Sequence, residues 1–150
     1  MNKTLQFSIT IRAPREIVWE RVTEKRYFDE WTSAFMPGST FEGSWNTGDA
    51  IRFLAPDGSG MSSIIETSRR PEFVSIRHVG EIKDGVEDRD SEQVRRWAPA
   101  YENYTLTEVD GATEFVVDVD VTPEYEQFMR DAWPAALAKL KELSERSGAA

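Results

Sequence analysis

The only histidine of the chain, His78, is the side chain whose charge changes most readily near neutral pH. Val74, Ile76 and His78 alternate along one segment, so in a strand they share a face. If that face lines a cavity, Ile76 contacts a bound molecule and His78 orients it by hydrogen bonding. A partly buried structural histidine is the commoner arrangement, and both interpretations stay open.

Two tyrosines lie on opposite faces of the strand predicted at 100–109. Tyr101 and Asn103 share one face, while Glu102 and Tyr104 share the other. Either face can turn a tyrosine hydroxyl into a pocket, and cross-strand packing of aromatic side chains is the alternative. We take Tyr101 and Asn103 as candidates for the cavity.

No residue pattern identifies a catalytic centre. Glu66, Glu81 and Glu102 are strand carboxylates, and a buried one can act as a general acid or base, but nothing singles one out. The sequence contains no GxSxG, GxGxxG or P-loop pattern. Ser33 and Ser44 have no base at a meaningful spacing. We therefore expect no catalytic residue.

Metal and cofactor sites are not expected either. With no cysteine and one histidine, the chain cannot build the usual zinc site, and it has no disulfide. No ordered loop of carboxylates resembles a calcium-binding loop.

Large apolar side chains supply a second set of candidates. We predict that they face inward and either fill the core or line a hydrophobic ligand pocket. We further expect two of them, both tryptophans, to lie near the same cavity. The set consists of Trp31, Phe35, Phe53, Phe128 and Trp133.

These residues are positioned by strands that alternate apolar and polar side chains and by helices with an apolar stripe. A strand is predicted at 5–12, followed by a short helix that begins around Pro14 and includes Val18 and Val22, and by a second at 27–35. Further strands are predicted at 39–45, 50–54, 60–67, 72–82, 100–109 and 113–121. Asp110-Gly111 indicates a tight hairpin. A long amphipathic helix follows Thr122-Pro123, with a kink expected at Pro134.

This order predicts one α+β domain over residues 1–150. A curved antiparallel sheet of about six strands has to cover its inner face, and the long helix is the only element large enough to do so. The two short helices after the first strand are expected to close one end. The segment 83–99 is predicted to be a polar loop with a short helical piece. Its residues Arg95, Arg96 and Trp97 form a lid or a partner surface, or they belong to a solvated loop with the tryptophan packed back on the sheet.

Six segments resemble a known family in order and number. They read FSITIRAPREIVWERVT, YFDEWTSAF, PDGSGMSSIIE, FVSIRHVGEIKDG, RRWAPAYENYTLTEVDGATEF and FMRDAWPAALAKLKELSE. They are similar to bacterial proteins homologous to the C-terminal domain of the Hsp90 ATPase activator Aha1, in the START-like (SRPBCC, Bet v 1-like) superfamily. The resemblance implies a helix-grip fold and a cavity between sheet and helix.

Three functions are compatible with that resemblance. The first is non-catalytic binding of a small hydrophobic or amphipathic ligand. The second is an interaction module for an Hsp90-type chaperone, although 150 residues leave no room for the separate N-terminal domain with which full-length Aha1 engages Hsp90. The third is a cyclase- or hydrolase-like enzyme.

The composition indicates which binding partners and which cellular location to expect for this protein. The net charge of −9 disfavours nucleic acid and anionic membranes. No apolar run is long enough for a membrane helix, and Met1–Arg12 does not resemble a signal peptide. We expect a cytoplasmic protein, either a monomer or a homodimer.

Overall fold

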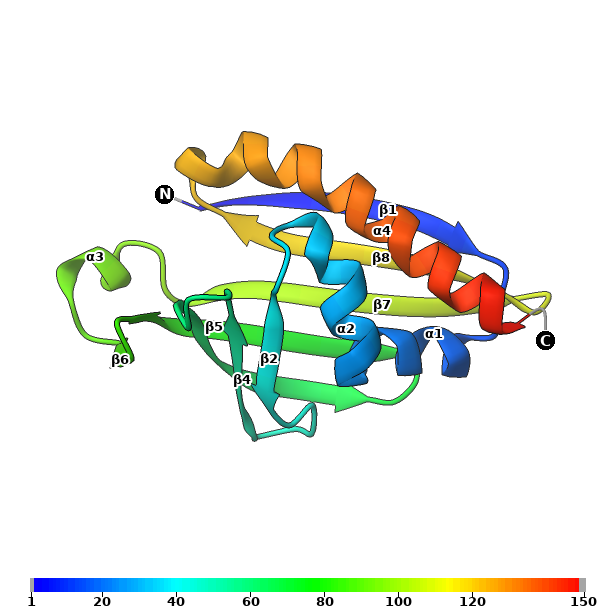
Figure 1. The fold of residues 1–150 in the computed structure, drawn as a ribbon, viewed down its shortest axis with the longest axis horizontal. Coiled ribbons are helices and arrows are strands. Elements are labelled where there is room, and N and C mark those ends of the chain that lie inside the picture. Colours follow the sequence, from blue (N-terminus) through cyan, green and yellow to red (C-terminus); the bar gives the residue numbers. More distant parts are fainter. Residues whose placement is uncertain (1, 149–150) are drawn as a thin grey trace.

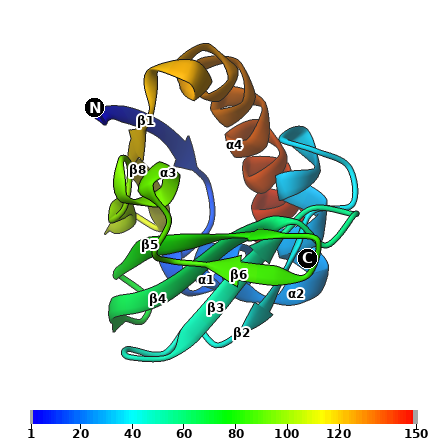
Figure 2. The same ribbon diagram turned by 90° about the vertical axis from the view of Figure 1, so that its left-hand side faces the viewer.

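One curved antiparallel sheet and a long C-terminal helix that lies along its inner face make up most of the molecule (Figures 1 and 2). The computed structural model describes residues 2–148. The strands are β1 (Lys3–Ile11), β2 (Thr40–Gly43), β3 (Ala50–Leu54), β4 (Gly60–Arg69), β5 (Phe73–Lys83), β6 (Val86–Asp88), β7 (Ala100–Val109) and β8 (Ala112–Val121). The helices are α1 (Arg15–Thr23), α2 (Lys25–Trp31), α3 (Glu92–Arg95) and α4 (Glu126–Gly148).

The strand order is β1-β8-β7-β5-β4-β3-β2, and β6 pairs with β5 away from that path. This architecture confirms the predicted helix-grip fold. The sheet has eight strands where about six were expected. One difference is β6, which forms in the segment predicted as a loop, because Asp84 and Gly85 turn the chain back with positive φ angles of 52° and 77°.

The alternation of side chains along β1 and β8 fixes their register. Leu5 pairs with Val119 and Ile9 with Phe115, so apolar side chains of both strands face α4. The tight turn between β7 and β8 has positive φ at both central residues, 53° at Asp110 and 80° at Gly111, as the predicted hairpin requires.

The long helix continues through Pro134 as one element. Proline has no N–H, so the carbonyl of Arg130 receives no bond from it, but both residues are exposed and water can pair with that carbonyl. The predicted cap at Thr122 differs in detail. Its side chain makes no capping hydrogen bond, and a 3₁₀ turn, Pro123–Tyr125, precedes α4 instead.

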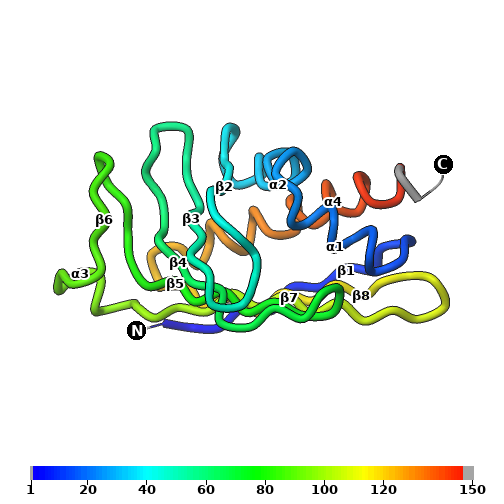
Figure 3. The backbone as a smooth tube through the Cα atoms, turned by 90° about the horizontal axis from the view of Figure 1, so that it is seen from below, coloured from blue at the N-terminus to red at the C-terminus, as the bar shows by residue number. Residues whose placement is uncertain are grey.

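The core lies between α4 and the sheet, with α1 and α2 packed against α4 (Figure 3). A 3₁₀ turn, Thr32–Ala34, extends α2 towards β2. Among the described residues, no helix is long and apolar enough to cross a membrane. The buried face of α4 is formed by Trp133, Ala136, Leu137, Leu140 and Leu143.

Candidate functional site

A cavity of about 290 Å³ lies between the end of α2, the β3–β4 hairpin, the centre of the sheet and the first turns of α4. It is positioned by elements that are far apart in the sequence, so only the folded chain assembles it. Its wall is mainly apolar, and its aromatic side chains lie edge to face or tilted against one another. The wall includes Phe28, Trp31, Phe35, Phe53, Phe128 and Trp133.

Met36 and Phe128 stand at the rim of the cavity. They are 49% and 46% exposed, and every other lining residue within residues 2–148 is less exposed. The ring of Phe128 lies 6.4 Å from that of Phe35, which connects the rim to the inner wall. A molecule that enters the cavity therefore passes between α4 and the segment that follows α2.

Gly60 lets β3 and β4 approach closely beside the cavity. A Cβ atom at this position would lie 1.8 Å from the carbonyl oxygen of Phe53, well inside van der Waals contact. A side chain here would push the two strands apart. Phe53 and Gly60 both line the cavity, so this close approach also sets the position of the Phe53 wall.

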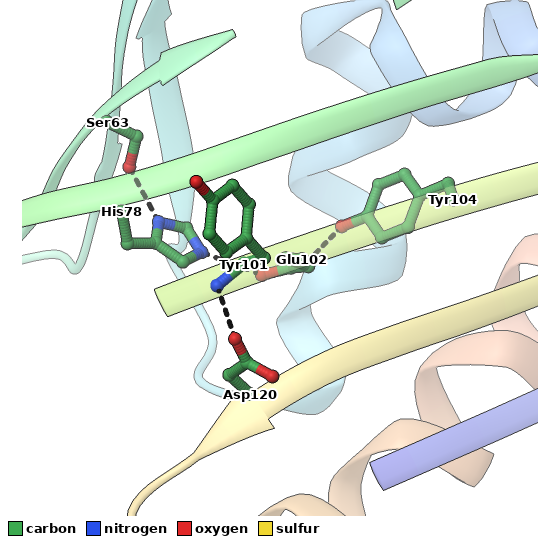
Figure 4. A network of polar contacts seen from close by, with 6 residues as sticks. All are labelled: Ser63, His78, Tyr101, Glu102, Tyr104 and Asp120. Carbon is green, nitrogen blue, oxygen red and sulfur yellow. Dashed lines mark hydrogen bonds and ion pairs between the residues drawn. The ribbon is translucent and has the colours of Figure 1, made fainter. Parts of the chain in front are cut away.

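A hydrogen-bonded chain of four side chains lies beside the cavity (Figure 4). Three of them, His78, Glu102 and Tyr104, line the cavity and form its polar floor. Ser63 Oγ lies 2.6 Å from His78 Nδ1, and His78 Nε2 lies 3.0 Å from Glu102 Oε1. The Tyr104 hydroxyl donates to Glu102 Oε2. The chain spans β4, β5 and β7, which are neighbours in the sheet.

The contacts of Ser63 indicate which nitrogen of His78 carries the proton. Within residues 2–148, the imidazole is the one hydrogen-bond partner of the Ser63 hydroxyl, which is fully buried. A buried hydroxyl needs an acceptor for its hydrogen, so Ser63 donates to Nδ1. With Nδ1 as the acceptor, the ring N–H is on Nε2 and points to Glu102 Oε1.

Burial raises the pKa of Tyr104 well above its ordinary value of 10.0, and the negative charge and hydrogen bond of Glu102 raise it further. The folded state therefore holds this proton more tightly than the unfolded state does. The protonated Tyr104 hydroxyl therefore contributes to the free energy of unfolding. This contribution is fully present below the unfolded pKa near 10 and is lost as the pH rises above that value.

We expect the free energy of unfolding to fall more steeply between about pH 9 and about pH 11 in the natural protein than in Tyr104→Phe. Urea denaturation at both pH values measures this difference. Tyr125→Phe is the matched control, because Tyr125 is exposed. Equal pH dependence in the natural protein and in Tyr104→Phe would contradict the expectation.

The Ser63, His78 and Glu102 contacts superficially resemble a nucleophile triad, but the geometry does not support acyl transfer. Ser63 has no exposed surface and does not line the cavity, so a substrate does not reach its hydroxyl. A nucleophile must contact the reacting atom. No group of three or more potential metal ligands occurs among the described residues.

Six of the nine sequence-predicted residues line the cavity, namely Trp31, Phe35, Phe53, His78, Phe128 and Trp133. The rings of Trp31 and Trp133 are 6.0 Å apart. Ile76 faces the same side of β5 as His78 but is fully buried in the core away from the cavity. That these residues bind a ligand stays a prediction.

Tyr101 and Asn103 do not line the cavity, because the inner face of β7 carries Glu102 and Tyr104 instead. The Tyr101 hydroxyl donates to Glu66 on the outer face, at 3.4 Å. Its backbone N–H donates to Asp120 Oδ2, at 2.9 Å (Figure 4). The sequence showed which residues of β7 share a face but did not show which face turns inward.

Trp97 packs back onto the sheet. Its indole N–H donates to Glu81 Oε1 on β5, at 3.0 Å, and its side chain is partly buried. Of the two interpretations of the 83–99 segment, the structure supports the one in which this tryptophan rests on the sheet.

Two donors beside the cavity lack partners. The indole nitrogens of Trp31 and Trp133 are buried and have no hydrogen-bond partner among the described residues, although both side chains line the cavity. An unpaired buried donor costs about 1–3 kcal/mol. The sequence pattern indicates both tryptophans as apolar residues, but it contains no signal that their N–H groups serve as polar contacts.

A curved antiparallel sheet that grips one long helix, with a cavity between them, defines the helix-grip class of START-like domains. The chain belongs to the activator of Hsp90 ATPase homolog 1-like family, whose sequence profile matches residues 12–145. This match confirms the resemblance found in the sequence. No curated protein matches the chain.

Three solved structures share the fold. A protein of Mesorhizobium loti has a TM-score of 0.73 at 17% identity, covering 96% of this chain and 98% of its own. Aha1 of Colwellia psychrerythraea, solved as a dimer, has a TM-score of 0.71 at 15% identity, covering 93% and 94%. A protein of Cytophaga hutchinsonii has a TM-score of 0.70 at 19% identity, covering 99% and 97%. Identities this low show the fold alone.

Proposed function

We propose that this protein is a non-catalytic binding domain that takes up a small hydrophobic or amphipathic molecule in the cavity between sheet and helix. The observation that carries the proposal is an aromatic cavity into which a few polar groups converge. Ligand sites in proteins commonly combine apolar walls with a small number of well-placed polar groups.

The size of the cavity limits the ligand. Its volume of about 290 Å³ is just below the roughly 300–1,000 Å³ typical of ligand pockets. A molecule of one or two rings suits this volume better than a sterol does. The unpaired indole groups of Trp31 and Trp133 support the proposal, because an acceptor atom on a ligand can pair with them.

Thermal unfolding with 1-naphthylmethanol as the probe tests the proposal. A ligand at one hundred times its Kd stabilises the folded state by about 2.7 kcal/mol, which raises Tm by roughly 5–10 °C for a chain of this size. We expect a saturable rise, accompanied by a change in tryptophan fluorescence because Trp31 and Trp133 line the cavity.

A cavity-filling variant provides the control. Met61 lines the cavity, and Met61→Trp replaces it with a larger side chain. We expect this variant to fold and to lose the ligand-dependent rise. Val86→Trp places the same side chain at a position that is 66% exposed, and it should keep the rise. A rise of equal size in all three proteins would point to binding outside the cavity and contradict the proposal.

The family to which the chain belongs supports a second candidate, an interaction module for an Hsp90-type chaperone. The test is the ATPase rate of a purified Hsp90 with and without this protein. Stimulation that Met61→Trp leaves unchanged would assign the activity to the outer surface. A cytoplasmic location and a monomeric or dimeric state stay predictions, and the dimeric Aha1 of Colwellia psychrerythraea makes the dimer worth testing.

A further inference from the structure

We propose that the cavity selects apolar molecules that carry a protonated amine and disfavours apolar carboxylic acids. This inference rests on the proposed ligand binding and adds the chemical class of the ligand. It follows from the charge and hydrogen-bonding state of one carboxylate, Glu102, on the cavity floor.

Glu102 is the one lining residue within 2–148 that carries a full formal charge, since no lysine or arginine lines the cavity. Its side chain is 18% exposed, so it is accessible from the cavity. His78 and Tyr104 each donate one hydrogen bond to it. A carboxylate has about four acceptor positions, so two donors leave capacity for a third.

His78 meets this carboxylate as a hydrogen-bond donor. Its Nδ1 accepts the hydrogen of the buried Ser63 hydroxyl, and its Nε2–H points to Glu102. A second proton on the ring would leave the Ser63 hydrogen without an acceptor among the described residues. With the ring proton on Nε2, the floor presents the carboxylate of Glu102 to the cavity, and no lysine or arginine in the lining opposes it.

Aromatic side chains of the cavity wall also border the two residues that donate to Glu102. Phe53 lies 5.7 Å from the ring of His78, ring centre to ring centre, and Trp31 lies 6.5 Å from the ring of Tyr104. Aromatic faces attract ammonium groups. An ammonium group near Glu102 also forms a charge-assisted hydrogen bond, which is stronger than a neutral one. A ligand carboxylate at the same place would meet a like charge where little water screens it.

The unpaired indole donors do not reverse this preference. Trp31 and Trp133 offer two neutral N–H groups, which suit an ether or carbonyl oxygen on the same ligand. They bring no formal charge and so do not offset the charge of Glu102. The polar groups of the cavity thus fit a molecule with a cationic end and, at most, a neutral acceptor elsewhere.

Three probes that share one ring system test the proposal: 1-naphthylmethylamine, 1-naphthylmethanol and 1-naphthoate. Their Kd values are measured by calorimetry at neutral pH. We expect the amine to bind about ten- to one-hundredfold more tightly than the alcohol, and the carboxylate to bind more weakly than the alcohol.

Two variants separate the cavity charge from the general negative charge of the surface. In Glu102→Gln we expect the ratio of alcohol Kd to amine Kd to fall towards one. Glu66→Gln removes the same charge from the outer face of β4, beside Arg77, and should keep the ratio of the natural protein. Raising the salt concentration should also leave that ratio nearly unchanged, because a partly buried pair is screened less than an exposed one. Circular dichroism checks that both variants fold.

The outcomes distinguish the two proposals. If the alcohol binds in the cavity but the amine has no advantage, the amine selectivity is overturned and ligand binding stands. If the carboxylate binds most tightly, or if Glu66→Gln loses the ratio as Glu102→Gln does, the assignment to Glu102 is wrong. If none of the probes binds, both the selectivity and the binding function are contradicted.

Discussion

Replacing Phe115 with alanine is expected to lower the free energy of unfolding by about 3–5 kcal/mol. Phe115 is fully buried on β8, and its ring lies 5.4 Å from that of Tyr104. Because it does not line the cavity, its removal leaves a new void rather than enlarging an existing opening. Urea denaturation measures the loss. If Phe115→Ala does not fold, Phe115→Leu should still fold and lose less stability.

Phe128→Ala is the matched control for this prediction. Phe128 is the same residue type, but it stands exposed at the rim of the cavity on α4. Its truncation should cost less than about 1 kcal/mol of stability, because substitutions at exposed positions usually have small effects. The same variant should weaken binding of 1-naphthylmethanol. Equal losses of stability at the two positions would contradict the assignment of core and rim.

Replacing Glu102 with leucine is expected to lower the free energy of unfolding by about 1–3 kcal/mol. The leucine leaves the Nε2–H of His78 and the hydroxyl of Tyr104 without their acceptor. Glu66→Leu, at an exposed position of β4, which β5 separates from β7, should change stability by no more than about 0.5 kcal/mol.

A double-mutant cycle with Tyr104→Phe isolates the Glu102–Tyr104 contact. Once Glu102 is gone, removing the hydroxyl also removes an unpaired buried donor. The double variant should therefore lose less stability than the two single losses added together, with a coupling of about 0.5–3 kcal/mol. Strict additivity would show that the two side chains do not interact.

The sequence determined the fold because the fold depends on local patterns. Alternation in β1 and β8, the Asp110-Gly111 turn and the apolar stripe of α4 are each readable from neighbours in the chain. The extra strand β6 was missed because three residues are too few to show a period. Large apolar residues such as Trp133 could be assigned inward for the same local reason.

The site depended on information that no local pattern contains. Tyr101 and Glu102 alternate equally well, and only the pairing of β7 with β5 and β8 decides that Glu102 turns inward. Ser63 and His78 come from different strands, and their contact arises from the irregular β4–β5 register beside Ser63. The sequence by itself therefore determined a helix-grip domain with an aromatic interior. Only the tertiary structure placed the carboxylate of Glu102, with its two hydrogen-bond donors, at the floor of a cavity. The physical reason is that this arrangement depends on which strands are neighbours in the sheet.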